Sequence, residues 1–206
     1  MKLGIIGLPQ SGKTTIFNAV TRGNAPTTAS AGRFEVHNSV VDVPDPRVTI
    51  LSKMFNPKKT IYAKMTYADI AGLETGSAKS GISGQLLNQL AQMDGFLLVV
   101  RAFESDLVMH PSGSVDAKRD VESMLGELLL NDLIAVERKL KKIKDERKKG
   151  GTDKALNEKQ SILFTRLNEA LNNNIPLRKL EYTSEEIKEL SSFGLLSRKP
   201  VLVVFN

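Results

Sequence analysis

Residues 7–15 carry the clearest chemical pattern in the chain. The run Gly7-Leu8-Pro9-Gln10-Ser11-Gly12-Lys13-Thr14 matches every fixed position of G-x-x-x-x-G-K-[ST]. Glycines let the backbone curl closely around an anion, and its N–H groups then form a nest at the positive end of a helix. The pattern predicts binding of a purine nucleoside triphosphate, ATP or GTP, with phosphate contacts from Pro9, Gln10, Ser11, Gly12, Lys13, Thr14 and Thr15.

A second pattern, Asp69-Ile70-Ala71-Gly72, follows a predicted strand. In many phosphate-loop proteins an Asp at the end of such a strand holds the Mg²⁺ shell. The hydroxyl of Thr14 is a hard oxygen ligand that also suits Mg²⁺. Thr14 and Asp69 are therefore the predicted metal residues. Gly72 would turn a backbone N–H toward the γ-phosphate, so Lys13 and Gly72 are the predicted catalytic positions.

The residue after this pattern, Leu73, stands where Ras-like enzymes carry a water-orienting Gln. A Leu side chain has neither donor nor acceptor and cannot orient water, so we expect slow intrinsic hydrolysis. The Gly-rich segment Glu74–Gly84 is interpreted as a second switch. Its Ser80–Gln85 portion superficially resembles the signature of ABC transporter ATPases, but that signature would have to precede the acidic strand.

Two rival functions use the same loop. One is a nucleotide-gated protein- or RNA-binding module with negligible hydrolysis, which Leu73 and the switch-like Glu74–Gly84 segment favour. The other is a small-molecule kinase, which would need an acceptor pocket and usually Arg residues in a lid. No lid pattern is visible. Phosphate release in the absence of any acceptor would separate a hydrolase from a kinase.

Five short apolar runs predict strands, and helices between them imply parallel β-α-β units in a layered α/β sheet. A helix is expected over Thr14–Thr21, directly after the phosphate loop. Pro44-Asp45-Pro46 is interpreted as a turn. The expected strands are Lys2–Ile6, Phe34–Val43, Ile61–Tyr67, Phe96–Val100 and Pro200–Phe205.

The middle of the chain has a helical pattern. Val115–Lys149 contains no Pro and carries apolar residues spaced 4, 3, 4, 3, as in a coiled coil: Leu129, Leu133, Val136, Leu140 and Ile143. Further helices are expected over Asp153–Leu171 and from Thr183 or Ser184, where Glu186 is available for a capping box. We therefore expect a helical insertion over residues 115–198, within a nucleotide-binding domain formed by residues 1–114 plus 199–206.

The composition bounds the class of protein. Its 206 residues are 41% hydrophobic and 5% aromatic, and they include no Cys, so disulfides and thiolate metal sites are excluded. The longest apolar run falls short of the roughly 18 residues that span a membrane. We expect a cytoplasmic monomer without a membrane partner. Neither His37 nor His110 has metal-ligand spacing, so structural or surface roles are expected for both.

The net charge of +6 is concentrated in one segment. Arg138–Lys149 holds eight basic and two acidic residues, next to the Gly150-Gly151 break, and the rest of the chain balances to zero. A projecting basic tip of this kind can reach phosphates, so we expect it to contact the sugar-phosphate backbone of ribosomal RNA. The alternative is a solvated helix end whose basic residues complement the helix dipole.

Four segments together resemble the YchF/Obg-like ATPase family of Obg-related P-loop GTPases. They are the phosphate loop with Phe17-Asn18-Ala19, then Val43-Pro44-Asp45-Pro46-Arg47, Asp69-Ile70-Ala71-Gly72-Leu73 and Val99-Val100-Arg101-Ala102-Phe103. Weaker matches follow at Gly113–Asp116 and Asp120–Glu122. The resemblance implies a Ras-like α/β domain in a three-layer sandwich with an inserted coiled-coil hairpin. It further implies a ribosome-associated nucleotide hydrolase that acts in translation or stress regulation.

Three departures from the family pattern stand out. Gln10-Ser11 replaces the family's Asn-Val, which puts activation by a monovalent cation in doubt. The first-switch Thr is not cleanly matched, and Thr27 and Thr28 both remain candidates. Asn206 matches the first residue of the base-reading motif, so the choice between ATP and GTP stays open. We expect the chain to lack the end of the α/β domain and the C-terminal TGS domain that full-length members carry.

Overall fold

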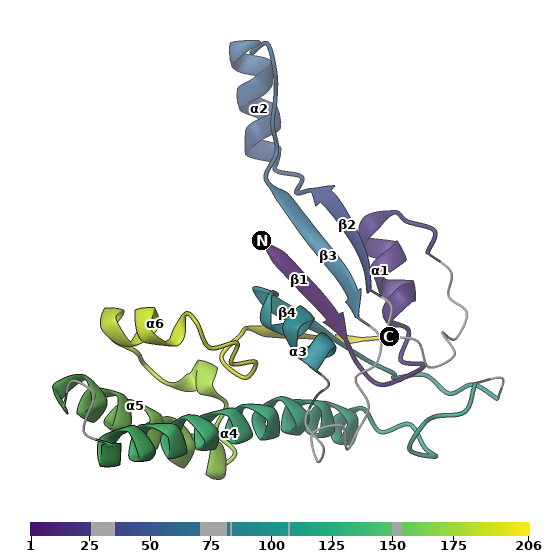
Figure 1. The fold of residues 1–206 in the computed structure, drawn as a ribbon. Coiled ribbons are helices and arrows are strands. Elements are labelled where there is room, and N and C mark those ends of the chain that lie inside the picture. Colours follow the sequence, from purple (N-terminus) through teal and green to yellow (C-terminus); the bar gives the residue numbers. More distant parts are fainter. Residues whose placement is uncertain (26–35, 71–81, 83, 107, 150–153) are drawn as a thin grey trace.

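A computed structural model describes residues 1–25, 36–70, 82, 84–106, 108–149 and 154–206, without the side chain of Lys149. Its centre is a five-stranded sheet in the order β2-β3-β1-β4-β5 (Figure 1). The strands are β1 (Lys2–Ile6), β2 (Val36–Asp42), β3 (Lys64–Ile70), β4 (Gly95–Val100) and β5 (Val201–Phe205). Within the ranges given, no helix has the length and hydropathy needed to cross a bilayer.

The sheet is parallel except at one edge. β1 pairs in parallel with β3 and β4, and β4 pairs in parallel with β5. β2 instead runs antiparallel to β3, which corrects the prediction of parallel units throughout. The reason lies in the connection between them. α2 (Pro46–Phe55) does not cross over a face of the sheet, and the chain returns beside the strand it left (Figure 1).

Helices cover both faces of the sheet, which confirms the predicted three layers. α1 (Lys13–Thr21) packs on one face, where Phe17 joins Ile5, Leu97 and Val99 in a small core. The other face carries α3 (Gly84–Ala91) and the first half of α4 (Ala117–Lys149), with Leu90 and Met124 in the larger core. The strands of the centre are almost wholly apolar because both of their faces are buried.

The predicted helical hairpin is present. α4 packs along α5 (Lys154–Asn172), and the spaced residues form its seam: Val136 and Ile143 are buried, while Leu129, Leu133 and Leu140 pack against the same core. Leu163, Leu167 and Ala170 of α5 are also buried there, whereas Leu156 is exposed and was wrongly placed on that face. The rest of the module comprises a 3-10 turn over Leu177–Lys179 and α6 (Ser184–Leu190).

Local signals set several helix ends. The capping box before α6 is confirmed, with Thr183 as N-cap and Glu186 bonding back to it. The interpretation of Pro44-Asp45-Pro46 as a turn is incomplete, because this run starts a helix. The Asp45 side chain accepts a hydrogen bond from the Arg47 N–H, and Pro46 occupies the first turn, where its missing N–H costs nothing.

Candidate functional site

The phosphate loop joins β1 to α1 at the carboxyl edge of the sheet. The ends of neighbouring strands meet at this edge, since Ile5 of β1 lies beside Asp69 of β3 and Ile6 lies beside Leu98 of β4. This edge is where ligands bind in open α/β sheets. The loop, Asp69, Arg101 and Asn206 therefore come together from four strands.

Two loop glycines are required by the space around them. Gly7 and Gly12 have positive φ angles of 153° and 91°. A Cβ at Gly7 would collide with the carbonyl oxygen of Val99, and one at Gly12 would collide with the side-chain amide of Asn206. Only glycine allows the backbone to curl this tightly against its neighbours. The turn leaves backbone N–H groups at the N-terminus of α1, as an anion nest requires.

Thr14 and Asp69 meet although 55 positions separate them in sequence. The Thr14 Oγ1 donates a hydrogen bond of 2.7 Å to the Asp69 Oδ2. Asp69 is buried, and its second oxygen, Oδ1, has no hydrogen-bond partner. A hydroxyl beside a buried, half-satisfied carboxylate is a donor set that suits a hard cation such as Mg²⁺.

This pair is not a complete metal cage. In the described part of the chain, no three His or acidic side chains gather as a metal site would need. Mg²⁺ commonly takes one or two protein oxygens and completes its shell with water and substrate phosphates. The residues present therefore fit a cation that binds together with a nucleotide.

The Lys13 ammonium group lies within the loop itself. Its Nζ donates hydrogen bonds to the carbonyl oxygens of Gly7 at 3.1 Å and Leu8 at 2.9 Å. Burial lowers the pKa of Lys13, and the negative charge of Asp69 opposes that shift. A cation held in a poorly solvated loop gains more from an incoming phosphate than an exposed one does.

Asn206 closes the loop from the far side. Its Nδ2 donates a 3.0 Å hydrogen bond to the backbone oxygen of Ser11, and its own N–H bonds to Val100. The prediction placed Asn206 at the nucleotide, and the structure places it against the loop that would hold the phosphates. Its contact with Ser11 supports the shape of the loop.

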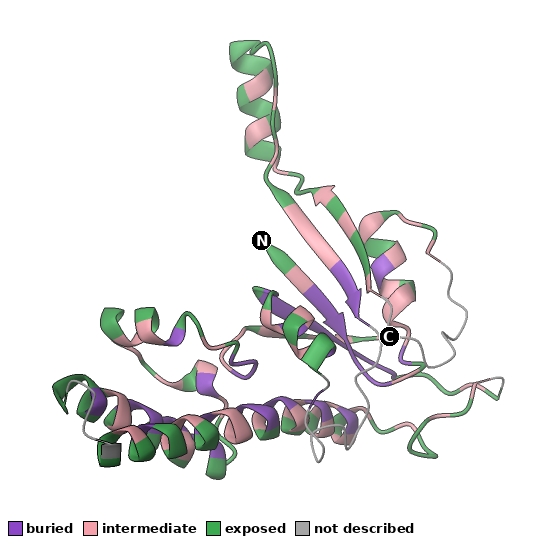
Figure 2. Cartoon of the chain, in the orientation of Figure 1, coloured by how far each residue is buried: buried purple, intermediate pink, exposed green. Residues whose placement is uncertain are grey.

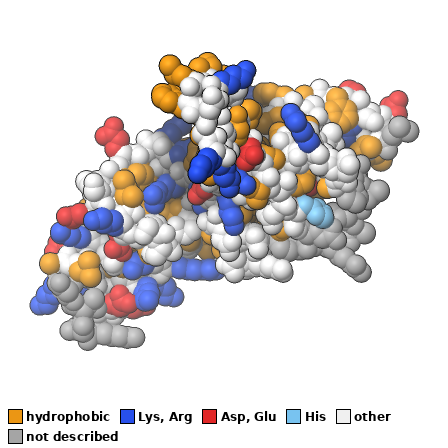
Figure 3. Space-filling model, turned by 90° about the horizontal axis from the view of Figure 1, so that it is seen from above, with side chains coloured by type: hydrophobic (Ala, Val, Ile, Leu, Met, Phe, Trp, Pro, Cys, Tyr) orange, Lys and Arg blue, Asp and Glu red, His pale blue; other side chains and the backbone are white. Residues whose placement is uncertain are grey.

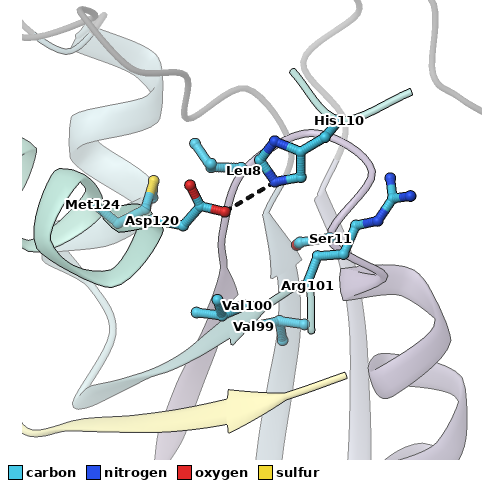
Figure 4. Close-up of a pocket in the computed structure, with 8 residues that line it drawn as sticks. All are labelled: Leu8, Ser11, Val99, Val100, Arg101, His110, Asp120 and Met124. Carbon is cyan, nitrogen blue, oxygen red and sulfur yellow. Dashed lines mark ion pairs between the residues drawn. The ribbon is translucent and has the colours of Figure 1, made fainter. Parts of the chain in front are cut away.

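A small cavity of about 10 Å³ lies behind the loop (Figure 4). The Ser11 Oγ and one Arg101 nitrogen on its wall are buried without hydrogen-bond partners. His110 and Asp120 meet there in an ion pair with 2.9 Å between Nε2 and Oδ2. The volume is about that of one water, and polar groups without partners are the usual hosts of such a water.

Sequence reasoning missed Arg101 as part of this region. Arg101 is 2% exposed and directly follows the fully buried strand β4. Its guanidinium donates hydrogen bonds to the backbone oxygens of Phe103 and Val108 and holds the segment after β4 beside the loop. A charged residue at the carboxyl end of an apolar strand was the available signal.

Of the remaining predicted positions, some lie within the described residues and others do not. Pro9, Gln10 and Thr15 lie in or directly after the loop turn, with Gln10 in the left-handed conformation at φ 62°. The switch positions Gly72, Leu73, Thr27 and Thr28 lie outside the described residues, as does nearly all of Glu74–Gly84. His37 lies in β2, opposite Asp69 across the β2–β3 pair.

Thr14→Val is expected to reduce the effect of Mg²⁺ on nucleotide affinity by about tenfold or more, which corresponds to about 1.4 kcal/mol. The substitution keeps the size of the side chain but removes the hydroxyl that contacts Asp69. The measurement is ATP binding at a series of Mg²⁺ concentrations. Thr14→Ser keeps the hydroxyl and serves as the control. An unchanged Mg²⁺ dependence in Thr14→Val would contradict the assignment.

Comparisons with known proteins identify the family of the chain. The model of the family described as 50S ribosome-binding GTPase matches residues 2–149. A ribosome-binding ATPase YchF of Bacillus subtilis is 35% identical over 98% of this chain and 55% of its own length. An Obg-like ATPase 1 of Schizosaccharomyces pombe is 32% identical over the whole chain and 54% of its own length.

A solved structure of the Schizosaccharomyces pombe YchF GTPase superposes with a TM-score of 0.76 at 28% identity, over all of this chain and 56% of that one. This chain thus spans about half the length of the relatives it matches. The resemblance seen in the sequence motifs is confirmed. The chain belongs to the family of 50S ribosome-binding GTPases and is similar, along its whole length, to the YchF and Obg-like ATPases within that group.

Proposed function

We propose that this chain is the nucleotide-binding part of a slow, Mg²⁺-dependent ATPase or GTPase that acts as a ribosome-associated switch. The observation that carries the proposal is the meeting of Thr14 with Asp69 beside the Lys13 loop. The names of the matched relatives support the link to ribosomes. On this basis the chain acts in the cytoplasm, and we propose that it does so as a monomer.

The chain's own groups account for binding and charge stabilisation. Lys13 exchanges its two loop carbonyls for the β- and γ-phosphates, and the backbone N–H groups of the loop bind the remaining oxygens. Thr14 and Asp69 would hold Mg²⁺. The ion would supply positive charge to offset the charge that develops on the transferred phosphoryl group.

Orientation of the attacking water is the step of hydrolysis that the predicted site residues do not explain. Leu73 cannot orient a water molecule, so we propose that turnover stays slow until the ribosome or a bound ion completes the site. Gly72 contributes only a backbone N–H.

The proposal is tested by phosphate release from Mg²⁺–ATP and Mg²⁺–GTP without any acceptor. We expect release slower than about 1 s⁻¹, the low end of typical enzyme turnover, with stimulation by purified ribosomes. Release should stop when EDTA removes Mg²⁺. A rate no greater than that of Lys13→Ala, with and without ribosomes, would contradict hydrolysis. Tight binding with that result would instead favour the nucleotide-gated binding module.

We further propose that residues 1–114 plus 199–206 form the nucleotide-binding unit and that 115–198 form the helical insertion. α4 belongs to both, because its first half packs on the sheet and its second half forms the hairpin. A rigid helix shared in this way gives the hairpin a mechanical link to the nucleotide site.

The basic tip of this hairpin is the proposed contact with ribosomal RNA. Within Arg138–Lys149 most basic side chains are exposed. Lys139 is an exception, because its ammonium lies 5.7 Å from the ring of Phe164 and 5.8 Å from that of Phe193. Lys142 also has a partner, Glu146, at 3.8 Å. The tip lies at the end of α4 remote from the phosphate loop (Figure 1).

Replacing Lys141, Lys142, Lys144 and Lys148 with Gln is expected to weaken ribosome co-sedimentation and flatten its salt dependence. Each lost phosphate contact lowers the slope of log K against log salt by roughly 0.7–0.9. Arg at the same four positions keeps the charge and serves as the control. If the Gln variant binds like the unsubstituted chain at every salt concentration, the tip is only a solvated helix end.

A further inference from the structure

α2 projects from the sheet edge instead of packing on a face (Figure 1). None of its residues is buried, and Figure 2 shows it in exposed and intermediate colours along its whole length. Every other helix of eight residues or more buries at least one side chain in a core. The position of α2 therefore needs an explanation other than support of the sheet.

The polar and apolar sides of α2 are exchanged relative to an ordinary surface helix. Its hydroxyl side chains point toward the chain's own next segment: the Thr49 Oγ1 lies 3.1 Å from the Tyr62 hydroxyl, and the Ser52 Oγ lies 2.5 Å from the Thr60 Oγ1. The large apolar side chains instead face solvent, at 53–72% exposure. These side chains, here called the α2 apolar face, are Ile50, Leu51, Met54 and Phe55.

The spacing of the α2 apolar face is that of a docking helix. Positions i, i+1, i+4 and i+5 lie on one side of a helix, the arrangement used by helices that lie in a partner's groove. Contiguous exposed apolar patches of this kind mark interaction sites in soluble proteins. Ile61, in the segment that returns to the sheet, is also exposed.

Positive charge surrounds this face. Residues 46–64 contain five basic residues and no acidic one. Arg47 pairs with Asp45 and Lys64 with Asp42, but the described part of the chain offers no ion-pair partner to Lys53, Lys58 and Lys59. Figure 3, which views the molecule from above, shows orange hydrophobic side chains gathered beside blue basic ones over this projection.

We propose that the α2 apolar face docks into an apolar groove, rimmed by acidic side chains, on a protein of the ribosome. The inference rests on the ribosome association proposed above and assigns it a second contact. Charge complementarity selects an acidic partner for Lys53, Lys58 and Lys59. A groove is required because four large side chains must leave water together.

Ribosomal RNA fits this face poorly. RNA offers phosphates for the lysines, and Phe55 alone could stack on a base. The aliphatic side chains of Ile50, Leu51 and Met54 would find no apolar surface there. The tip of α4 differs in this respect, since the two large hydrophobic residues within its described part, Leu140 and Ile143, are partly or fully buried. The two elements therefore suit different partners on one particle.

The test is site-specific photocrosslinking to purified ribosomes. Phe55→p-benzoylphenylalanine places the probe on the α2 apolar face, and Ile162→p-benzoylphenylalanine places it on an exposed apolar position of α5. We expect the first probe to link to an acidic ribosomal protein, beside apolar residues, and the second probe not to do so. A link to RNA only, or to a second copy of the chain, would overturn the proposal. The same probe can be placed on the corresponding helix of a longer relative. A crosslink within that single chain would also overturn the proposal.

Affinity provides an independent readout. The double variant Leu51→Ser with Phe55→Ser is expected to weaken ribosome co-sedimentation about tenfold or more, as loss of buried anchors does. Its matched control is Leu156→Ser with Ile162→Ser, on α5. Both must first bind Mg²⁺–ATP like the unsubstituted chain. Unchanged co-sedimentation of the α2 variant overturns this docking alone, whereas absence of any ribosome binding by the unsubstituted chain overturns the ribosome association as well.

Discussion

Lys13→Ala is expected to lower the affinity for Mg²⁺–ATP and Mg²⁺–GTP by roughly ten- to hundredfold. Lys13 carries the only charge within the loop, and hydrogen bonds to charged groups contribute about 1.5–3 kcal/mol each. By the relation between free energy and affinity, this range corresponds to the stated loss. Equilibrium titration of each nucleotide into the folded variant measures it.

A matched control separates the loop from the overall charge. Lys118→Ala removes the same charge from an exposed position on α4, where the side chain is 86% exposed. We expect its nucleotide affinity to stay within about twofold, because screened charges at a distance contribute little. Equal losses in the two variants would mean that only net charge matters and that the loop has no specific role.

Asp132→Ala is expected to lower the free energy of unfolding by about 3 kcal/mol. Asp132 is fully buried in α4, and its carboxylate accepts hydrogen bonds from the N–H groups of Leu196 and Ser197 and from the Ser197 hydroxyl, at 2.6–2.8 Å. Removal of the acceptor leaves buried donors without partners, each at a cost of about 1–3 kcal/mol. Denaturant unfolding measures the change.

A substitution at an exposed acidic residue of the same helix provides the control for this prediction. Glu122→Ala removes an exposed acidic side chain from α4 and should change the free energy of unfolding by less than about 0.5 kcal/mol. If Asp132→Ala is no more destabilised than Glu122→Ala, the carboxylate does not hold the segment before β5. That result would also remove the link between α4 and the strand that leads to Asn206.

The same carboxylate gives an expected pH dependence. Burial raises the pKa of Asp132, and its hydrogen bonds oppose that shift. The folded chain then keeps the proton to a higher pH than the unfolded chain, whose Asp pKa is about 3.9. The contribution of Asp132 to the free energy of unfolding is therefore greatest below the pKa of the unfolded chain. It decreases as the pH rises through the raised pKa of the folded chain. Asp132→Asn cannot titrate and should lack this part of the slope.

The phosphate loop and the hairpin could be predicted because their patterns are local. The loop signature lies within nine residues, and β1 was predicted with its observed bounds, Lys2–Ile6. The coiled-coil spacing identified the buried seam of α4, since side chains three and four positions apart share one face. Thr14 and Asp69 were each predicted as metal residues from their own motifs, and the structure brings them into contact because the strands that lead to them end at one edge of the sheet.

Other features depend on contacts between distant residues and left no local signal. The antiparallel pairing of β2 arises because the connection through α2 does not cross a face of the sheet, and no pattern in Val36–Asp42 reports that. The hydrogen bonds of Asp132 to Ser197 join residues 65 positions apart. The ion pair of His110 with Asp120 needed the segment after β4 to turn back onto α4.

Charge reasoning from the sequence was incomplete for a different reason. The net excess was assigned to Arg138–Lys149 because the rest of the chain sums to zero. That sum hid residues 46–64, whose five basic side chains are balanced by acidic residues elsewhere. Only the structure shows that this segment projects from the sheet with its apolar side chains exposed.

Calorimetric titration of ATP and GTP into this chain, with and without Mg²⁺, tests the central claim most directly. We expect one nucleotide per chain, tighter binding when Mg²⁺ is present, and loss of that Mg²⁺ effect when Thr14 or Asp69 loses its oxygen ligand. Such a result would assign the nucleotide and its cation to the edge where Lys13, Thr14 and Asp69 meet. The account would be contradicted if the folded chain did not bind nucleotide. It would also be contradicted if the nucleotide affinity were unchanged both by removal of Mg²⁺ and by substitution of Lys13.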